Sequence, residues 1–124
     1  MVNTKTINDK PYVSYEALLI QTGTTAPIAT VLNNELDGTP IWSRIGVGGY
    51  RVTLSGTFTT DKTVILTGNK EYTLSGSEVD PYDVVVGVIS QDELYVDTVN
   101  NTTLVDGKLG NNTIPFFIEI RVYN

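Results

Sequence analysis

The sequence predicts an all-β protein, a single antiparallel β-sandwich preceded by an N-terminal arm. Composition is the first reason: the 124 residues include 18 threonines and 10 asparagines, and β-branched residues suit strands while asparagine suits turns. The second is that short alternating runs recur between turn signals, as in sandwiches and barrels. The third is that no segment makes a convincing helix. Hydrophobic residues form 40% of the chain, enough for one domain with a real core.

Residues 1–11 form the predicted arm, because they are polar, lack a repeating apolar pattern and end at Pro11. The sandwich domain is expected to cover residues 12–124. Val2 and Ile7 are apolar side chains in this polar segment, so we predict that they contact a neighbouring subunit. Deleting residues 1–10 is then expected to weaken assembly, as followed by light scattering, and to leave the far-UV β signal intact.

Three strands are predicted at the start of the domain. Tyr12–Gln21 is assigned as a strand although Glu16–Leu19 favours a helix, because no capping residue precedes it and the turn-rich TGTTAP follows. Ile28–Leu36 is the second strand, closed by a turn at Asp37–Gly38. Ile41–Ile45 is the third, since apolar and polar residues alternate along it.

The third strand divides its side chains between two faces. Trp42 and Arg44 share one face, and the other carries Ile41, Ser43 and Ile45. Trp42 is the single tryptophan of the chain, and such a side chain fills either a core or a subunit interface. We therefore keep Trp42 as an interface candidate beside the two residues of the arm.

The glycine-rich segment IGVGGYRVTLSGTF, Ile45–Phe58, raises the question of a phosphate-binding loop. A dinucleotide fingerprint needs G-x-G-x-x-G at the start of a helix, and a P-loop ends in lysine followed by serine or threonine. Here G-x-G-G leads into a strand and no lysine ends it. We therefore predict a hairpin turn, after which Tyr50, Val52 and Leu54 face the core.

The second half of the chain predicts six more strands: Thr63–Gly68, Glu71–Gly76, Asp83–Ser90, Glu93–Thr98, Thr102–Gly107 and Ile114–Tyr123. The apolar run VVVGV, Val84–Val88, favours a central strand covered on both faces. The last strand has the clearest alternation, with one face made of Phe116, Ile118, Ile120 and Val122. Periodicity does not reveal long-range pairing, so jelly-roll-like and immunoglobulin-like strand orders both stay open.

Composition argues against several activities. The chain has no cysteine and no histidine, which removes disulfides, thiol nucleophiles, imidazole bases and the zinc sites built on them. A net charge of −6 with scattered basic residues argues against nucleic-acid binding. No apolar run approaches the roughly 20 residues of a membrane span, and no export signal opens the chain. We therefore expect no enzyme, no cofactor, no metal site, and no nucleic-acid or membrane partner.

Carboxylates leave two weaker possibilities. An acidic group surrounds Pro81 and continues beyond it, made of Glu78, Asp80, Asp83, Asp92 and Glu93. Its spacing does not match an EF-hand loop, so a solvated acidic loop is favoured over a calcium site. A glycosidase would need two carboxylates across a cleft, and the sequence does not indicate such a pairing among Glu16, Glu35 and Glu119.

Aromatic residues support a binding alternative. A sugar-stacking platform could be built from Trp42, Tyr50, Tyr72, Tyr82 and Tyr95, although filling of the core or of an interface is the favoured interpretation. If the chain is a carbohydrate- or receptor-binding module, its predicted ligand-binding loops carry Asp80, Tyr82, Asp92 and Tyr95.

One long segment carries a resemblance. Tyr15–Leu66 contains ALLIQTGTTAPIATVLNN, then a tryptophan, then the strand GYRVTLSGTF and a Lys-Thr pair. These motifs resemble small β-rich proteins encoded by tailed bacteriophages and prophages of Bacteroidetes-type hosts. The resemblance implies a virion component, either a decoration or fibre protein of the head or a piece of the neck or tail. It brings no catalytic residue with it.

The expected function follows from these observations together. The chain is expected to be a non-enzymatic virion structural protein, with other copies of itself in a homo-oligomer and other virion proteins as its partners. Its expected location is the virion, reached from the host cytoplasm during assembly. The alternative is the carbohydrate- or receptor-binding module.

Overall fold

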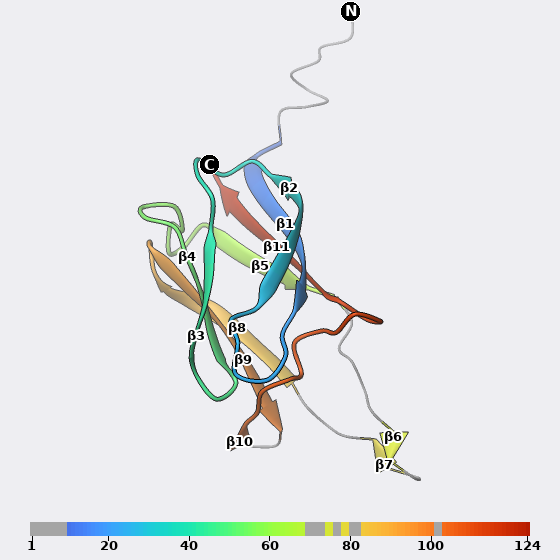
Figure 1. Cartoon of the computed structure of the whole chain (residues 1–124). Helices are drawn as coiled ribbons and strands as arrows, with labels where there is room; N and C mark the ends of the chain where they lie inside the picture. Colours follow the sequence, from blue (N-terminus) through green and yellow to red (C-terminus); the bar gives the residue numbers. More distant parts are fainter. Residues whose placement is uncertain (1–9, 69–73, 76–77, 80–82, 101–102) are drawn as a thin grey trace, which may run out of the picture.

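The structure is a computed structural model that describes residues 10–68, 74–75, 78–79, 83–100 and 103–124. The described residues form two antiparallel sheets packed face to face, and none of them is helical (Figure 1). The predicted all-β sandwich is therefore confirmed. None of these residues forms a helix of the length and apolarity that a membrane span requires.

The first sheet has four strands in the order β2-β1-β11-β5. Its strands are β1 (Tyr12–Ile20), β2 (Ile28–Asn34), β5 (Thr63–Thr67) and β11 (Phe116–Tyr123). The first and last long strands of the chain are thus neighbours, in a register that places Tyr15 opposite Ile120. This pairing brings the two ends of the domain together at one end of the sandwich (Figure 1).

The second sheet has five strands, in which β9 pairs with β4, β8 and β10, and β4 pairs with β3. Its strands are β3 (Ile41–Gly46), β4 (Gly49–Thr53), β8 (Asp83–Ser90), β9 (Glu93–Asn100) and β10 (Thr103–Leu104). A separate two-stranded ladder is formed by β6 (Leu74–Ser75) and β7 (Glu78–Val79).

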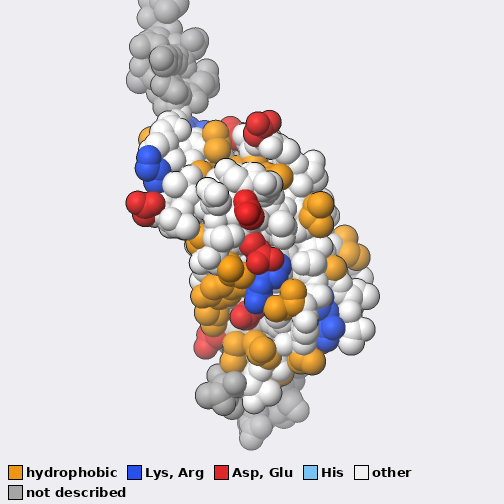
Figure 2. Space-filling model, turned by 90° about the vertical axis from the view of Figure 1, so that its left-hand side faces the viewer, with side chains coloured by type: hydrophobic (Ala, Val, Ile, Leu, Met, Phe, Trp, Pro, Cys, Tyr) orange, Lys and Arg blue, Asp and Glu red, His pale blue; other side chains and the backbone are white. Residues whose placement is uncertain are grey.

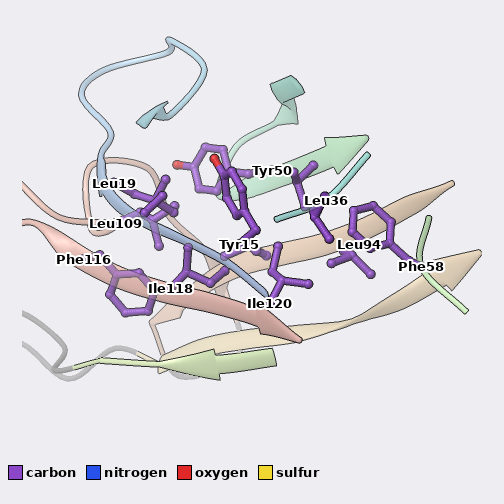
Figure 3. Packing of buried hydrophobic residues seen from close by; sticks show 13 residues of the cluster. Tyr15, Leu19, Leu36, Tyr50, Phe58, Leu94, Leu109, Phe116, Ile118 and Ile120 are labelled. Carbon is purple, nitrogen blue, oxygen red and sulfur yellow. The ribbon is translucent and has the colours of Figure 1, made fainter. Parts of the chain in front are cut away.

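The core lies between the sheets and takes alternate side chains from the inner strands, as period-2 patterning requires (Figure 3). The buried hydrophobic strand residues are Tyr15, Ala17, Leu19, Tyr50, Val52, Leu94, Val96, Phe116, Ile118 and Ile120. Leu36, Phe58 and Leu109 enter the same cluster from the connecting segments. The predicted inward faces of Tyr50–Leu54 and of the last strand are confirmed, with Leu54 and Val122 half-buried at the margin.

A buried glutamine joins two of these connections. Gln21 is 1% exposed, and its Nε2 donates to the carbonyls of Gly23 and Thr25 at 2.9 and 3.0 Å. Its Oε1 accepts the Gly107 N–H at 2.6 Å. A buried amide is tolerated when its donors and acceptor are satisfied, so Gln21 ties the loop after β1 to the segment before β11.

The prediction that Val84–Val88 is a central strand covered on both faces was wrong. β8 lies at the edge of its sheet and pairs with β9, and among its side chains Val85 and Ile89 are 45% and 47% exposed. Val84, Val86 and Val88 pack against the core. A run of β-branched residues identifies a strand but not its place in the sheet, because strand order depends on pairing between segments far apart in the chain.

Several predicted strands are shorter than expected, and for two of them the structure shows why. The strand predicted from Thr102 ends at Leu104, because Asp106 turns toward β3 and β4 and Gly107 takes a positive φ of 78°. The last strand begins at Phe116, because the Asn111 side chain accepts the N–H groups of Thr113 and Ile114 and closes a turn there. Of the strand predicted at Glu71–Gly76, the described residues are Leu74 and Ser75, which lie in β6.

Candidate interaction surface

The outer face of the five-stranded sheet is the most distinctive surface of the molecule. The register of β3 and β4 pairs Trp42 with Val52 and Arg44 with Tyr50, so these side chains turn inward. The intervening residues of β3 then turn outward, as the alternation predicts. Ile41 is 67% exposed and Ile45 is 63% exposed.

An ion pair and an aromatic ring occupy the middle of this face. The strand registers place Tyr95 of β9 between Arg51 of β4 and Gly87 of β8. The Arg51 guanidinium carbon lies 5.9 Å from the centre of the Tyr95 ring, within the range of a cation–π contact. Arg51 Nη1 also lies 3.2 Å from Asp97 Oδ1.

Gly87 is what allows the ring to lie flat across the edge strand. A Cβ at this position would come within 2.6 Å of the Tyr95 ring, so the ring covers the glycine backbone. We refer to the following residues as the five-strand face: Ile41, Ile45, Arg51, Val85, Ile89, Tyr95 and Asp97. Figure 2 shows hydrophobic side chains gathered around basic and acidic groups on this side of the molecule. Exposed aliphatic and aromatic groups that gather on one face mark a candidate surface for binding other proteins.

A carboxylate behind this face fixes the hairpin of β3 and β4. Asp106 accepts hydrogen bonds from Arg44 Nη2 at 2.7 Å, from the Tyr50 hydroxyl at 2.7 Å and from the Gly48 N–H at 2.9 Å. The Arg44 hydrogen bond contributes most to lowering the pKa of Asp106 to about 2. Burial, with the adjacent carboxylate, raises the pKa of Tyr50. Asp106 therefore stays ionised and Tyr50 stays protonated at neutral pH.

The predicted hairpin turn is confirmed as Val47–Gly48, between β3 and β4. Gly48 has a positive φ of 64°, and a Cβ there would lie 2.6–2.7 Å from backbone atoms of Thr98 and Val105. Its N–H donates to Asp106 and its carbonyl accepts from the Thr98 N–H at 2.9 Å. Glycine is therefore required at position 48, because the backbone packs closely there. The Gly48 N–H is bonded to a side chain of the same chain.

The predicted ligand-binding residues fall in different places. Tyr95 lies in the five-strand face, as described above. Asp92 lies in the turn between β8 and β9, where its Oδ1 accepts the Gly56 N–H at 2.6 Å, so this carboxylate joins two loops. Asp80 and Tyr82 lie outside the described residues.

The predicted interface residues are also separated. Trp42 lies on the inner face of β3, where it is half-buried against the core and its Nε1 donates to the Tyr15 hydroxyl at 3.2 Å. Packing within the domain accounts for this contact, and a role for Trp42 at a subunit interface stays a prediction. Val2 and Ile7 lie outside the described residues.

Carboxylates gather on the outer face of the four-stranded sheet. Glu16 of β1 and Glu119 of β11 stand directly opposite each other. Arg121 Nε donates to Glu119 Oε2 at 2.7 Å, and Lys10 Nζ donates to Glu35 Oε1 at 2.7 Å. The Lys10 hydrogen bond contributes most to lowering the pKa of Glu35.

These carboxylates do not form a metal site. In the part of the chain that the structure describes, no three acidic side chains are arranged to hold a metal ion. The basic partners of Glu35 and Glu119 instead make this region a set of surface ion pairs. The five-strand face therefore remains the strongest candidate for function among the described residues.

Neither Asp106 nor Arg51 was singled out by sequence reasoning. Asp106 lies 62 positions from Arg44, and no local pattern connects two residues across that separation. For Arg51 the available signal was alternation. Arg51 lies between Tyr50 and Val52 in one strand, so its side chain points to the other face of the sheet, away from the core.

Comparison of the chain with known proteins adds no relative. No protein family, no curated protein and no solved structure matches it. The case for a function therefore rests on the fold, on the surface described above and on the motifs of Tyr15–Leu66.

Proposed function

We propose that the chain is a non-enzymatic structural protein that acts through protein–protein interfaces, as a head-associated or neck or tail component of a tailed-phage virion. The observation that carries this proposal is the five-strand face, where aliphatic side chains that are 45–67% exposed surround a paired arginine and aspartate. The phage setting comes from the motifs of Tyr15–Leu66. Virion accessory proteins need a stable fold and interface area, and they need no reactive site.

The chemistry of the face fits a protein partner. Covering Ile41, Ile45, Val85 and Ile89 would remove apolar surface from water, which is the main favourable contribution to association. Arg51 and Asp97 already pair with each other, so a partner could cover them without leaving a lone charge buried. Tyr95 adds a large, stiff contact area of the kind enriched in interfaces.

The test is the native mass of the chain, expressed alone and together with the products of its neighbouring genes. We expect a larger complex on co-expression, because the five-strand face would then be covered. Ile41→Lys should remove that complex, since it places a charge among the aliphatic side chains. Val64→Lys is the matched control: Val64 is 43% exposed on the outer face of the other sheet, and its replacement should leave the complex intact.

Two results would contradict the proposal. One is the absence of any complex with the neighbouring gene products. The other is a complex that Ile41→Lys leaves unchanged, because that complex would not use the five-strand face.

A carbohydrate- or receptor-binding module is the second candidate, and Tyr95 is the observation that favours it. Its ring lies on an open sheet face beside a guanidinium and a carboxylate, the groups that stack on sugars and bond to their hydroxyls. A glycan array tests this candidate. Binding that Tyr95→Ala abolishes would support it, and an array without binding would exclude the glycan form.

A further inference from the structure

We propose that Asp37 is a site of spontaneous covalent modification, at which the Asp37–Gly38 linkage rearranges through a cyclic imide to an isoaspartyl linkage, and that the Asn34 side chain controls the rate. This inference goes beyond the proposed function and does not depend on it. The chain contains a second Asp-Gly pair, Asp106–Gly107. The two pairs have opposite surroundings in the structure, and that difference carries the proposal.

The chemistry needs an aspartate whose carboxyl group can reach the next amide nitrogen. The Gly38 nitrogen attacks the carboxyl carbon of Asp37 in its neutral form; the nitrogen loses H, the carboxyl group loses OH, and the two leave as water. Water then adds to either carbonyl of the ring. One opening restores aspartate, and the other leaves the main chain running through the Asp37 side chain. No oxidant or reductant is needed, and glycine favours ring closure because it has no Cβ to obstruct the approach.

The reacting groups of Asp37–Gly38 are open to water. Both residues are exposed, in the connection between β2 and β3. Among the described residues, the Asp37 carboxylate has no hydrogen-bonded or ion-pair partner. The Gly38 N–H donates to the Leu36 carbonyl at 3.0 Å, a bond that closes a γ-turn centred on Asp37. A ring of this size bends the hydrogen bond, so the bond does little to keep the nitrogen from the carboxyl group.

The same two groups are held in place in Asp106–Gly107. The Asp106 carboxylate accepts hydrogen bonds from a guanidinium, a phenol and a backbone N–H. The nitrogen that would attack it belongs to the Gly107 N–H, which donates at 2.6 Å to Oε1 of Gln21, a side chain that is 1% exposed. Ring closure here would break bonds to both reacting groups. In the folded chain we therefore expect the rearrangement at Asp37 and not at Asp106.

The Asn34 side chain holds the loop around Asp37 closed. Its Nδ2 donates to the Gly38 carbonyl at 2.9 Å, and its Oδ1 accepts the Leu36 N–H at 2.9 Å. One amide therefore bridges the residues on both sides of Asp37. In a planar ring Asp37 cannot keep the backbone torsions of a γ-turn, so closure moves Gly38 and the carbonyl that Asn34 holds. The Asn34 amide is thus expected to slow the reaction.

The modification would change a connection between the two sheets. An isoaspartyl linkage adds a methylene group to the main chain between β2, in the four-stranded sheet, and β3, in the five-stranded sheet. Leu36, the residue before Asp37, is 8% exposed and belongs to the core. A longer main chain there displaces Leu36 or the start of β3. The modified chain should therefore unfold at a lower temperature than the unmodified chain.

The test compares the two Asp-Gly pairs within one sample. The full-length chain is incubated at neutral pH, either folded or in concentrated urea. Isoaspartate is located by peptide mapping, in which isoaspartyl peptides elute apart from their isomers, and by methylation with a protein isoaspartyl methyltransferase. In the folded chain we expect isoaspartate to accumulate at Asp37 alone. In urea, where neither pair is held, we expect it at Asp37 and Asp106 at similar rates.

Variants test the role of Asn34. Asn34→Ala should raise the rate at Asp37 several-fold in the folded chain, because both hydrogen bonds that hold the loop are lost, and should leave the rate in urea unchanged. Asn33→Ala is the matched control: the Asn33 Nδ2 donates to the Ser14 hydroxyl, so this variant should keep the wild-type rate. Asp37→Glu should stop the modification at this position, because a longer side chain would have to close a larger ring.

The wild-type chain decides the proposal even if the variants do not fold. Isoaspartate at neither pair in the folded chain, or at both pairs at the same rate, would overturn it. An Asn34→Ala chain that is modified at the wild-type rate would overturn the role of Asn34. None of these results depends on whether the chain binds the products of its neighbouring genes, so the proposed function is tested separately.

Discussion

At the scale of single residues, Asp106 does the most to organise the structure. Its carboxylate accepts hydrogen bonds from a guanidinium, a phenol and a backbone N–H, which belong to β3, β4 and the turn between them. The side chains of Asp106 and Arg44 are 17% and 19% exposed, so little water competes for these bonds. The segment before β11 is thereby attached to the hairpin that carries Ile41 and Ile45.

Replacing Asp106 by asparagine should lower the free energy of unfolding by about 2 kcal/mol at neutral pH, because hydrogen bonds to a charged group are lost and Arg44 is left without its anion. Urea denaturation measures this. Asp61→Asn, at an exposed position, is the control and should cost less than about 0.5 kcal/mol. Equal midpoints for the two variants would show that the Asp106 network adds no stability.

The same residue predicts a pH dependence. The pKa of Asp106 is lowered from 3.8 to about 2 by folding, so its contribution is complete above about pH 4 and is lost as the pH falls toward 2. The difference in unfolding free energy between wild type and Asp106→Asn should therefore shrink over that interval. Parallel curves from pH 5 to pH 2 would contradict the assignment.

At the scale of elements, the β3–β4 hairpin shows why its turn contains glycine. Gly48 and Gly56 both have positive φ, of 64° and 65°, but a Cβ at Gly56 would meet no atom within 4 Å. At Gly48 the same Cβ would meet three backbone atoms at 2.6–2.7 Å. Comparing the two positions therefore separates the free-energy cost of backbone strain from the cost of steric collision.

Alanine substitutions should reveal this difference. Gly56→Ala should cost about 1 kcal/mol, the strain of a left-handed backbone, whereas Gly48→Ala should cost more because the backbone of Thr98 and Val105 must also move. Gly46→Ala is the control, since Gly46 has neither a positive φ nor a close neighbour. Thermal unfolding followed by circular dichroism measures all three. Equal losses of stability for the Gly48 and Gly56 variants would mean that the collision of the new Cβ at position 48 with the backbone is relieved without cost.

At the scale of the whole molecule, ion pairs and exposed aliphatic side chains lie on the outer faces of both sheets. Carboxylates and their basic partners occupy the outer face of the four-stranded sheet, near the end where β1 begins. Aliphatic side chains occupy the five-strand face and the β2 edge. An acidic sandwich with two apolar regions is suited to contacts with more than one neighbour.

Much of the fold could be predicted from the sequence, because alternation is a local property. The pattern of Phe116–Tyr123 identifies both the strand and its buried face, and the glycines after Ile45 identify the hairpin. The candidate site was predicted only in part. Tyr95 was named, and alternation puts Asp97 on the same face of β9, but Arg51 and Gly87 come from two other strands that local patterns cannot align with β9.

The sequence by itself determined that this chain is a β-sandwich, which strands alternate, and that thiol, imidazole and nucleic-acid chemistry are not expected of it. The tertiary structure decided which strands are neighbours. It placed Val84–Ile89 at an edge, joined Asp106 to Arg44, and left β2 open. The physical reason is that side-chain alternation depends on adjacent residues, whereas strand order depends on the total free energy of packing two sheets, to which residues far apart in the chain contribute together.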